Sequence, residues 1–279
     1  MRLSANDYIN WNNKAITLLG MSGVGKTTLA SKLSRDQWFH YSGDYRIGTR
    51  YLDEAILDDI KLHAMQIPCL RALLRSDSIY IANNITTDNL APLANFIGKI
   101  GRNEDGGLPL DEFQRRQALH HEAEILAMRD IVPFLHKARE IYQYPHFIND
   151  AGGSVCELDH PETIALLAEH TLMIYIEADT DREHDMIQSQ LDNPKPLYYH
   201  RAFFDEQLAI YLERQQLVGS DEIDPDEFVR RIFPRLIAAR KPRYEAIVRE
   251  HGYTVSARDA GEVRDEQDFH AFIAKALAG

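Results

Sequence analysis

Residues 20–28 read GMSGVGKTT and match in full the phosphate-binding pattern G-x-x-x-x-G-K-[ST]. The apolar run AITLLG leads into this loop and the helix-like LASKLS follows it, which is the strand-to-helix setting that the motif requires. In such a loop the backbone N–H groups point at phosphates, Lys26 reaches the terminal phosphates and the Thr27 hydroxyl binds Mg²⁺. We therefore predict a site for ATP and Mg²⁺. Its loop residues are Gly20, Ser22, Gly23, Val24, Gly25, Lys26, Thr27 and Thr28.

Runs with strand character alternate with helical runs along the chain. The strand-like runs are AITLL, WFHYSGD ending at Asp44, SIYIAN, HFIND, TLMIYIEA and GYTVSA. The helical runs are 51–75, TTDNLAPLANFIGKIG, 110–142 with an interruption near Pro133, 182–219, 225–247 and DEQDFHAFIAKALA. This alternation predicts an α/β protein, a three-layer α/β/α P-loop NTPase fold with a mainly parallel sheet, as one domain over 1–279.

The composition is typical of a protein of the cell interior. The 279 residues include 43 acidic and 31 basic ones, and the net charge of −12 disfavours unspecific attraction to nucleic acid or to an anionic membrane. No apolar run has membrane-spanning length, and the two cysteines, Cys69 and Cys156, have no metal-binding spacing. We expect buried thiols, a cytoplasmic location and no membrane partner.

Several further motifs resemble those of shikimate kinases and related small-molecule kinases. The phosphate loop, SGDYRIG, the double glycine after HFIND, HTLMIYIEA, KPL and RKPRYEAIVREHGYTVSA occur in the order of that family, over about half of the chain. The resemblance implies that Asp44 holds and deprotonates the acceptor hydroxyl, that Gly152 and Gly153 line the acceptor pocket, that Lys195 is the basic residue of the lid, and that Arg240 binds the acceptor.

The chain departs from the family pattern at positions around the expected pocket. Ser42 stands where the family has a first carboxylate, and Ala151 replaces a third glycine. Metal placement then depends on Thr27 and another acid. Asp150 is the candidate because it ends an apolar strand beside the strand of the phosphate loop.

Two other features differ from a minimal family member. The arginine expected before the third strand is Arg129, or alternatively Arg115 or Arg116. A helical insertion over 51–109 and an enlarged lid over 182–235 have no counterpart. The stretch from GLPLDEFQRRQ to NDAGGSVCELD also resembles bacterial proteins described only as ATPases, and that resemblance names no substrate.

Each candidate residue has a structural alternative. Asp44 could cap the turn before Tyr45, Asp150 could be a turn acid, and Lys195 and Arg240 could be solvated surface cations. The group His120, His121 and Glu124 has helical spacing, but without a third ligand nearby we expect a solvated helix surface. The aromatic group Tyr198, Tyr199, Phe203 and Phe204 suits lid packing better than base stacking, and RRIFPRLIAARKPR suits a packed amphipathic helix.

Two classes of function follow. The first is a kinase that transfers the γ-phosphate of ATP to a small hydroxylated metabolite, and the second is a nucleotide-dependent ATPase or switch whose 51–109 insertion binds a protein or nucleic-acid partner. We favour the kinase, and we do not expect a nucleic-acid partner. The chain has no N-K-x-D motif for guanine. The sequence leaves the acceptor and the oligomeric state open.

Overall fold

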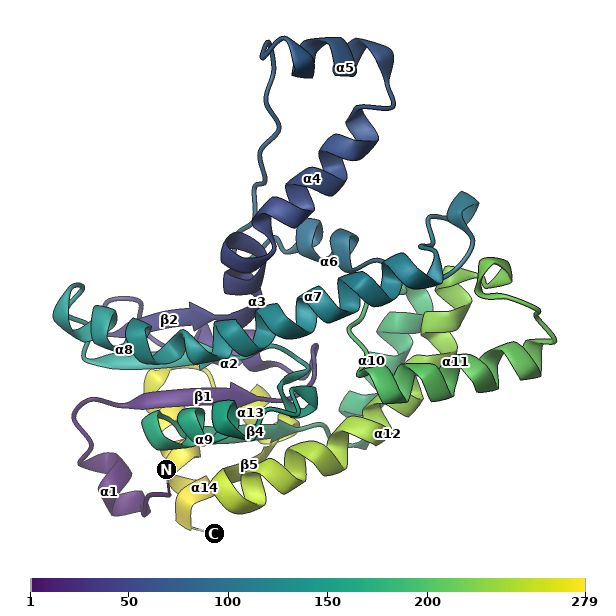
Figure 1. The fold of residues 1–279 in the computed structure, drawn as a ribbon. Coiled ribbons are helices and arrows are strands. Elements are labelled where there is room, and N and C mark those ends of the chain that lie inside the picture. The colour runs from purple at the N-terminus through teal and green to yellow at the C-terminus, as the bar shows by residue number, and fades with distance from the viewer. Residues whose placement is uncertain (1, 279) are drawn as a thin grey trace.

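A five-stranded parallel sheet forms the centre of the protein (Figure 1). The structure is a computed structural model that describes residues 2–278. The strands are β1 (Ala15–Leu19), β2 (Trp38–Ser42), β3 (His146–Asp150), β4 (Leu172–Glu177) and β5 (Gly252–Ser256), and their order across the sheet is β2-β3-β1-β4-β5. Every neighbouring pair is parallel. The predicted α/β class is confirmed, and the carboxyl ends of all five strands meet at one edge.

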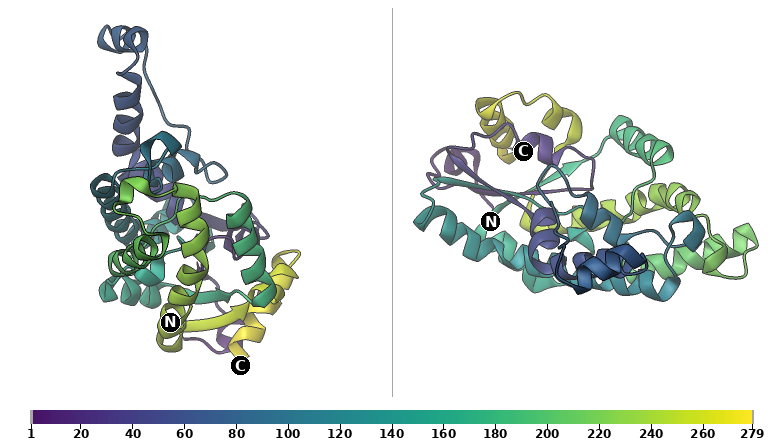
Figure 2. Two further views of the ribbon diagram at one scale, coloured as in Figure 1. Left: turned by 90° about the vertical axis from the view of Figure 1, so that its right-hand side faces the viewer. Right: turned by 90° about the horizontal axis from the view of Figure 1, so that it is seen from above.

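Helices cover both faces of the sheet, which gives the three layers (Figure 2). One face packs against α1 (Ala5–Ile9), α2 (Lys26–Ala30), α13 (Ala257–Gly261) and α14 (Glu266–Ala278). The other packs against α7 (Leu110–Arg129), α8 (Ile131–Glu140), α9 (Pro161–His170) and α12 (Pro225–His251). Alternate side chains of β1 enter the two cores, Ile16 and Leu18 on one side and Ala15 and Leu19 on the other. Such strands, buried on both faces, are typical of parallel sheets.

The remaining elements follow β2, β3 and β4. They are α3 (Gly43–Arg46), a π-helical turn η1 (Ile47–Tyr51), α4 (Asp53–Ala64), α5 (Pro68–Arg75), α6 (Ala91–Ile97), α10 (Thr180–Asp192) and α11 (Arg201–Gln215), with short 3₁₀ turns at η2 (Asn103–Asp105), η3 (Val155–Glu157) and η4 (Ser220–Glu222).

Two predictions about strands were wrong. The second strand ends at Ser42, because the Ser42 side chain accepts a hydrogen bond from the N–H of Tyr45 and starts α3. The run SIYIAN, residues 78–83, forms no strand, since it lies in a segment that pairs with no other strand. Strand propensity alone does not make a strand without a partner.

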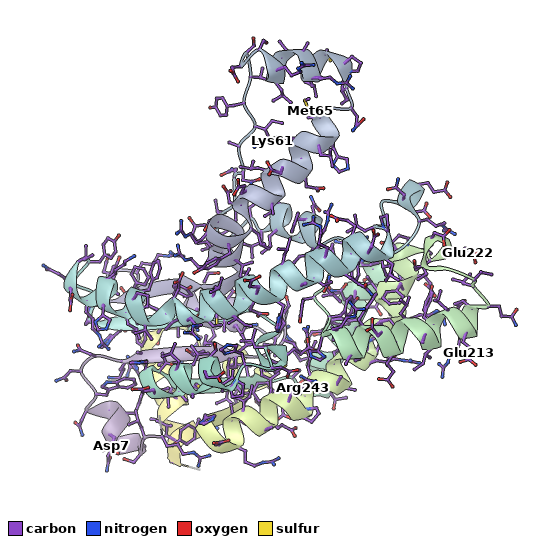
Figure 3. All side chains as sticks on the ribbon, in the orientation of Figure 1. Asp7, Lys61, Met65, Glu213, Glu222 and Arg243 are labelled. Carbon is purple, nitrogen blue, oxygen red and sulfur yellow. The ribbon has the colours of Figure 1, made fainter. Side chains whose placement is uncertain are left out.

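An arm formed by α4, α5 and the segment that returns to α6 projects from the body (Figures 1 and 2). It is part of the predicted 51–109 insertion. Ile56 at its base is buried, whereas none of the residues of α5 is buried and Leu62 and Tyr80 are 61% and 89% exposed. The labelled side chains of Lys61 and Met65 in Figure 3 lie on this arm, away from the sheet. The second half of the insertion does pack, because α6 buries three apolar side chains.

The longest helix, α12, carries the RRIFPRLIAARKPR segment and packs as predicted, with Ile232, Phe233, Leu236 and Ile237 buried. No helix within residues 2–278 combines the length and the apolar character needed to cross a membrane. The expectation of two buried thiols was half wrong. Cys156 is buried, and burial raises its pKa to about 12, but Cys69 is exposed on the arm.

Candidate functional site

The phosphate loop has the backbone geometry that its glycines permit. It joins β1 to α2, and Gly20, Gly23 and Gly25 have φ angles of 141°, 88° and 111°. Residues with a Cβ rarely adopt this left-handed region. The conformation therefore depends on glycine at these three positions.

Lys26 lies folded back over the loop. Its side chain is buried, with the residue 6% exposed, and Nζ donates to the carbonyl oxygens of Gly20 at 2.7 Å and Met21 at 3.1 Å. Burial lowers the pKa of the ammonium, while the carboxylates of Asp150 and Asp44 oppose that change. The cation is thus held by two carbonyl groups of its own loop.

Thr27, in the first turn of α2, and Asp150, at the carboxyl end of β3, meet beside the phosphate loop. Asp150 is the last residue of β3 and lies in register with Leu18 of β1, which brings it beside the phosphate loop. The Thr27 hydroxyl donates to Oδ2 of Asp150 at 2.5 Å. Mg²⁺ in nucleotide sites takes one or two carboxylates and hydroxyls together with phosphate oxygens. The Thr27 and Asp150 oxygens fit that donor set.

Asp44 lies in the first turn of α3 and faces the phosphate loop. It lines a cavity of about 300 Å³ together with Lys26, Thr27, Asp150 and Gly153. Asp44 does not supply the cap before Tyr45, because Ser42 does. Burial raises the pKa of Asp44; Lys26 lowers it and Asp150 raises it further. The carboxyl group is thus available to a ligand in the cavity.

The double glycine brings the turn after β3 against its neighbours. A Cβ on Gly153 would lie 2.7 Å from the backbone N of Ser22, and a Cβ on Gly152 would collide with the Glu124 carboxyl and approach Oδ1 of Asp44 at 3.2 Å. Any larger residue would push this turn away from the phosphate loop. Gly153 also lines the cavity beside the loop, whereas Gly152 lies against the carboxyl groups of Glu124 and Asp44.

Glu124 is a site residue that the sequence interpretation missed, because it was expected on a solvated helix surface. It is 1% exposed, its Oε2 accepts from Ser154 Oγ at 2.7 Å, and its Oε1 is buried with no hydrogen-bond partner among the described residues. Burial raises its pKa to about 7, and nearby Asp44 adds to the rise. The helical spacing did indicate this burial, since Phe113, His120 and Ala127 lie on the same face of the helix as Glu124 and are buried too.

His120 was also wrongly expected in solvent. It is buried and its ring stacks on Tyr198 at 5.2 Å between centroids, and burial lowers its pKa to about 3. Among residues 2–278, no group of three or more His, Cys, Asp or Glu side chains is arranged to hold a metal ion. His120 is thus a neutral core histidine in this fold.

Arg240 is neither a surface cation nor free to bind a ligand. It is 3% exposed, and Nε and Nη2 donate to Oε2 of Glu157 at 2.9 and 2.7 Å. Nη1 donates to the Gly153 carbonyl at 3.1 Å and Nη2 to the Tyr198 carbonyl at 2.9 Å. Although burial alone would lower it, the pKa of Arg240 is raised because Glu157 lies beside it. The guanidinium holds the turn after β3 in place.

The other predicted cations lie away from the cavity. Lys195 is exposed on the loop between α10 and α11, and Arg129 is exposed at the end of α7. Arg115 pairs with Glu112 on the surface, and Arg116 is buried against Asp59 and the Phe96 carbonyl. A role for Lys195 would require its loop to move toward the phosphate loop. None of the three arginines lines the cavity.

The cation that does face the phosphate loop is Arg182, in the first turn of α10. It lines the phosphate-loop cavity and a second, adjoining cavity of about 300 Å³, which also share Gly25 and Thr28. The adjoining cavity continues to Arg258 and Val263 after β5. The sequence predicted the lid but not the position of this residue, because nothing in the residues around an arginine of a polar helix indicates what its side chain will face.

Comparisons with known proteins add little to this geometry. Neither the scan of protein-family models nor the search of curated proteins finds a match. Among solved structures, the chain is similar to a shikimate kinase from Bacteroides thetaiotaomicron, with a TM-score of 0.37 and 13% identity over 94% of this chain and 95% of that one. Nothing about the chemistry of this chain follows from a similarity of that size.

Proposed function

We propose that the protein is an ATP-dependent phosphotransferase that transfers the γ-phosphate of ATP to a hydroxyl group of a small metabolite. The observation that carries this proposal is one cavity in which a free carboxyl group, Asp44, faces a complete phosphate loop. Transfer to an alcohol needs such a group, because the acceptor hydroxyl must be oriented and must lose its proton.

The nucleotide would occupy the two adjoining cavities. Its phosphates would meet the backbone N–H groups of the loop and Lys26, and its base and ribose would extend past Arg182 toward Arg258. Thr27 and Asp150 would hold Mg²⁺, which when bound neutralises charge on the phosphate oxygens. Lys26 would leave its two carbonyl partners and pair with the terminal phosphates.

The acceptor would approach from the side of Asp44. Oxygen atoms of Asp44 would accept the hydroxyl proton while Arg182 stabilises the negative charge of the transferred group. Among the described residues that line the phosphate-loop cavity, Arg182 is the only arginine, and it borders the nucleotide. An acidic acceptor such as shikimate would lack a cation for its carboxylate, so we expect a neutral or weakly charged acceptor.

A mass-resolved screen tests this function. The protein, ATP and Mg²⁺ are incubated with a small-molecule extract, and Lys26→Ala serves as the control for contaminating kinases. A metabolite that gains one phosphoryl group with wild type only is the expected result. Stoichiometric ADP and inorganic phosphate with no phosphorylated metabolite would refute the kinase assignment.

The arm supports the second candidate, a nucleotide-dependent ATPase or switch. Exposed apolar side chains such as Leu62, Ile67, Leu73 and Tyr80 lie on it, and α5 buries no residue. Several exposed apolar side chains on one projecting segment favour an interaction site there. This function predicts ATP hydrolysis without an acceptor, and hydrolysis that changes when residues 60–80 are replaced by a short linker.

A further inference from the structure

A third cleft, of about 210 Å³, lies between α11 and the first half of α12. On each helix its lining includes two residues four positions apart, which share one helix face. It has no lining residue in common with either of the two nucleotide cavities, so neither ATP nor an acceptor in contact with Asp44 would occupy it. The residues that matter below are Ile210, Tyr211 and Arg214 of α11 and Arg230, Arg231 and Arg235 of α12.

The lining of this cleft is basic and contains no carboxyl group. Arg231 pairs with Glu227 at 2.6 Å, whereas within residues 2–278 no Asp or Glu forms an ion pair with Arg214, Arg230 or Arg235. Both nucleotide cavities, by contrast, include aspartates in their linings. In a chain with a net charge of −12, the cleft is therefore a local excess of positive charge.

Neutral acceptors hold two of these arginines. Nε of Arg230 donates to the Leu191 carbonyl at 3.0 Å, and Nη1 of Arg235 donates to Oε1 of Gln207 at 2.6 Å. These contacts orient the side chains without cancelling their charge, and each occupies one of the five N–H donors of a guanidinium. The remaining donors suit the oxygens of an anion, because the planar fork of arginine matches phosphate and carboxylate geometry.

The basic run RRIFPRLIAARKPR is only partly explained by helix packing. Its apolar residues enter the core, as predicted, but its first three arginines line the cleft instead. Packing needs apolar side chains on one face and places no requirement for positive charge on the other. The positive charge of the cleft is thus a feature for which the fold alone gives no reason.

The size of the cleft limits the ligand. Pockets for drug-sized molecules measure about 300 to 1,000 Å³, so this cleft holds something smaller than a nucleotide. Part of its wall is apolar, because Ile210 and Tyr211 line it and the Tyr211 ring is fixed by Phe228, with centroids 5.1 Å apart. The negative charge of the whole chain disfavours a long polyanion such as nucleic acid.

We propose that this cleft binds a small organic phosphate, a molecule in which a phosphate dianion is attached to an apolar group of about one ring in size. Arg214, Arg230 and Arg235 would hold the phosphate, and the apolar group would lie against Ile210 and Tyr211. A dianion matches three arginines without carboxylate partners better than a single negative charge does. The proposal does not depend on the kinase assignment, since the cleft shares no residue with the phosphate loop.

Phenyl phosphate and phenyl sulfate form a matched pair of probes, because they have nearly the same shape but carry about two negative charges and one at pH 8. Binding of each to the full-length protein is measured by ligand-observed NMR titration. Phenyl phosphate should bind saturably and at least about fivefold more tightly than phenyl sulfate, and added salt should weaken its binding. Equal affinities, or no saturable binding of phenyl phosphate, would overturn the proposal.

Two charge reversals locate the site. Arg214 is exposed, so Arg214→Glu should leave the fold intact, and it should weaken binding of phenyl phosphate at least about tenfold. Arg249→Glu makes the same change of charge at an exposed position near the other end of α12 and should change the affinity by less than about twofold. Equal losses in the two variants would show that only net charge matters and would refute the site.

A further variant separates this cleft from the phosphate loop, which is itself an anion site. Lys26→Ala removes the cation of that loop and should retain saturable binding of phenyl phosphate. Adding Arg214→Glu to Lys26→Ala should then abolish the binding. Thermal unfolding reports that each variant is folded. Loss of binding in folded Lys26→Ala alone would place the probe on the phosphate loop and would refute the assignment.

Discussion

Glu124→Gln should make the protein less sensitive to alkaline pH. The Glu124 carboxyl is buried beside the phosphate loop, has one unpartnered oxygen, and has its pKa raised by burial from 4.5 to about 7. Glutamine has nearly the same shape, can accept the Ser154 hydrogen bond and does not ionise. The substitution therefore removes the titration and little else.

The magnitude follows from proton linkage. The unfolded chain loses the Glu124 proton near pH 4.5 and the folded chain near pH 7, so the folded state binds more protons between these values. The wild-type free energy of unfolding consequently falls as pH rises through this window and levels off above it. At about 1.4 kcal/mol per pH unit, wild type should lose about 2 to 3 kcal/mol relative to Glu124→Gln between pH 5 and pH 8.

Urea unfolding at fixed temperature between pH 5 and pH 8 measures this difference. The control is Glu122→Gln, because Glu122 is exposed one half-turn away on the same helix. The difference in the free energy of unfolding between this variant and wild type should stay nearly constant over the same pH range. Parallel pH profiles for wild type and Glu124→Gln would refute the account of Glu124 as a buried carboxyl that is neutral below pH 7.

Three further substitutions test the phosphate loop and its support. Lys26→Ala should weaken binding of Mg·ATP at least about a hundredfold in a titration calorimeter, because the cation for the terminal phosphates is lost, and unchanged affinity would remove the loop from the mechanism. Arg240→Ala should lower the free energy of unfolding by about 3 to 5 kcal/mol, since it leaves a buried carboxylate unpaired, whereas exposed Arg129→Ala should change it by less than about 0.5 kcal/mol. Gly153→Ala should weaken ATP binding while the protein stays folded, because its Cβ would push against the backbone N of Ser22, and wild-type affinity would show that the turn can yield.

Local sequence predicted those features whose determinants are close together in the chain. The phosphate loop follows from nine consecutive residues with glycines at 20, 23 and 25. Strands β1, β3 and β4 follow from apolar runs bounded by polar residues, since a central strand of a parallel sheet is buried on both faces. The strand-end position of Asp150 then follows from the order of the strands.

The rest depends on contacts between distant residues. Arg240 belongs to a recognisable motif, yet its role is decided by Glu157, which lies 83 residues away and is equally buried. Lys195 and Arg182 are both cations of the predicted lid, and only the path of α10 decides which of them faces the loop. Glu124 lies on the face of α7 that also buries Phe113, His120 and Ala127, but its position beside Asp44 depends on how α7 packs against α3.

The most direct test of the kinase proposal compares wild type with Asp44→Asn. ATP hydrolysis and transfer are measured side by side, with and without the metabolite extract. The proposal predicts unchanged ATP affinity, slow hydrolysis by both proteins without an acceptor, and transfer reduced by on the order of 10² to 10⁴ in the variant, because the proton acceptor is lost and the phosphate loop is not. Fast hydrolysis that needs no acceptor and survives Asp44→Asn would contradict it.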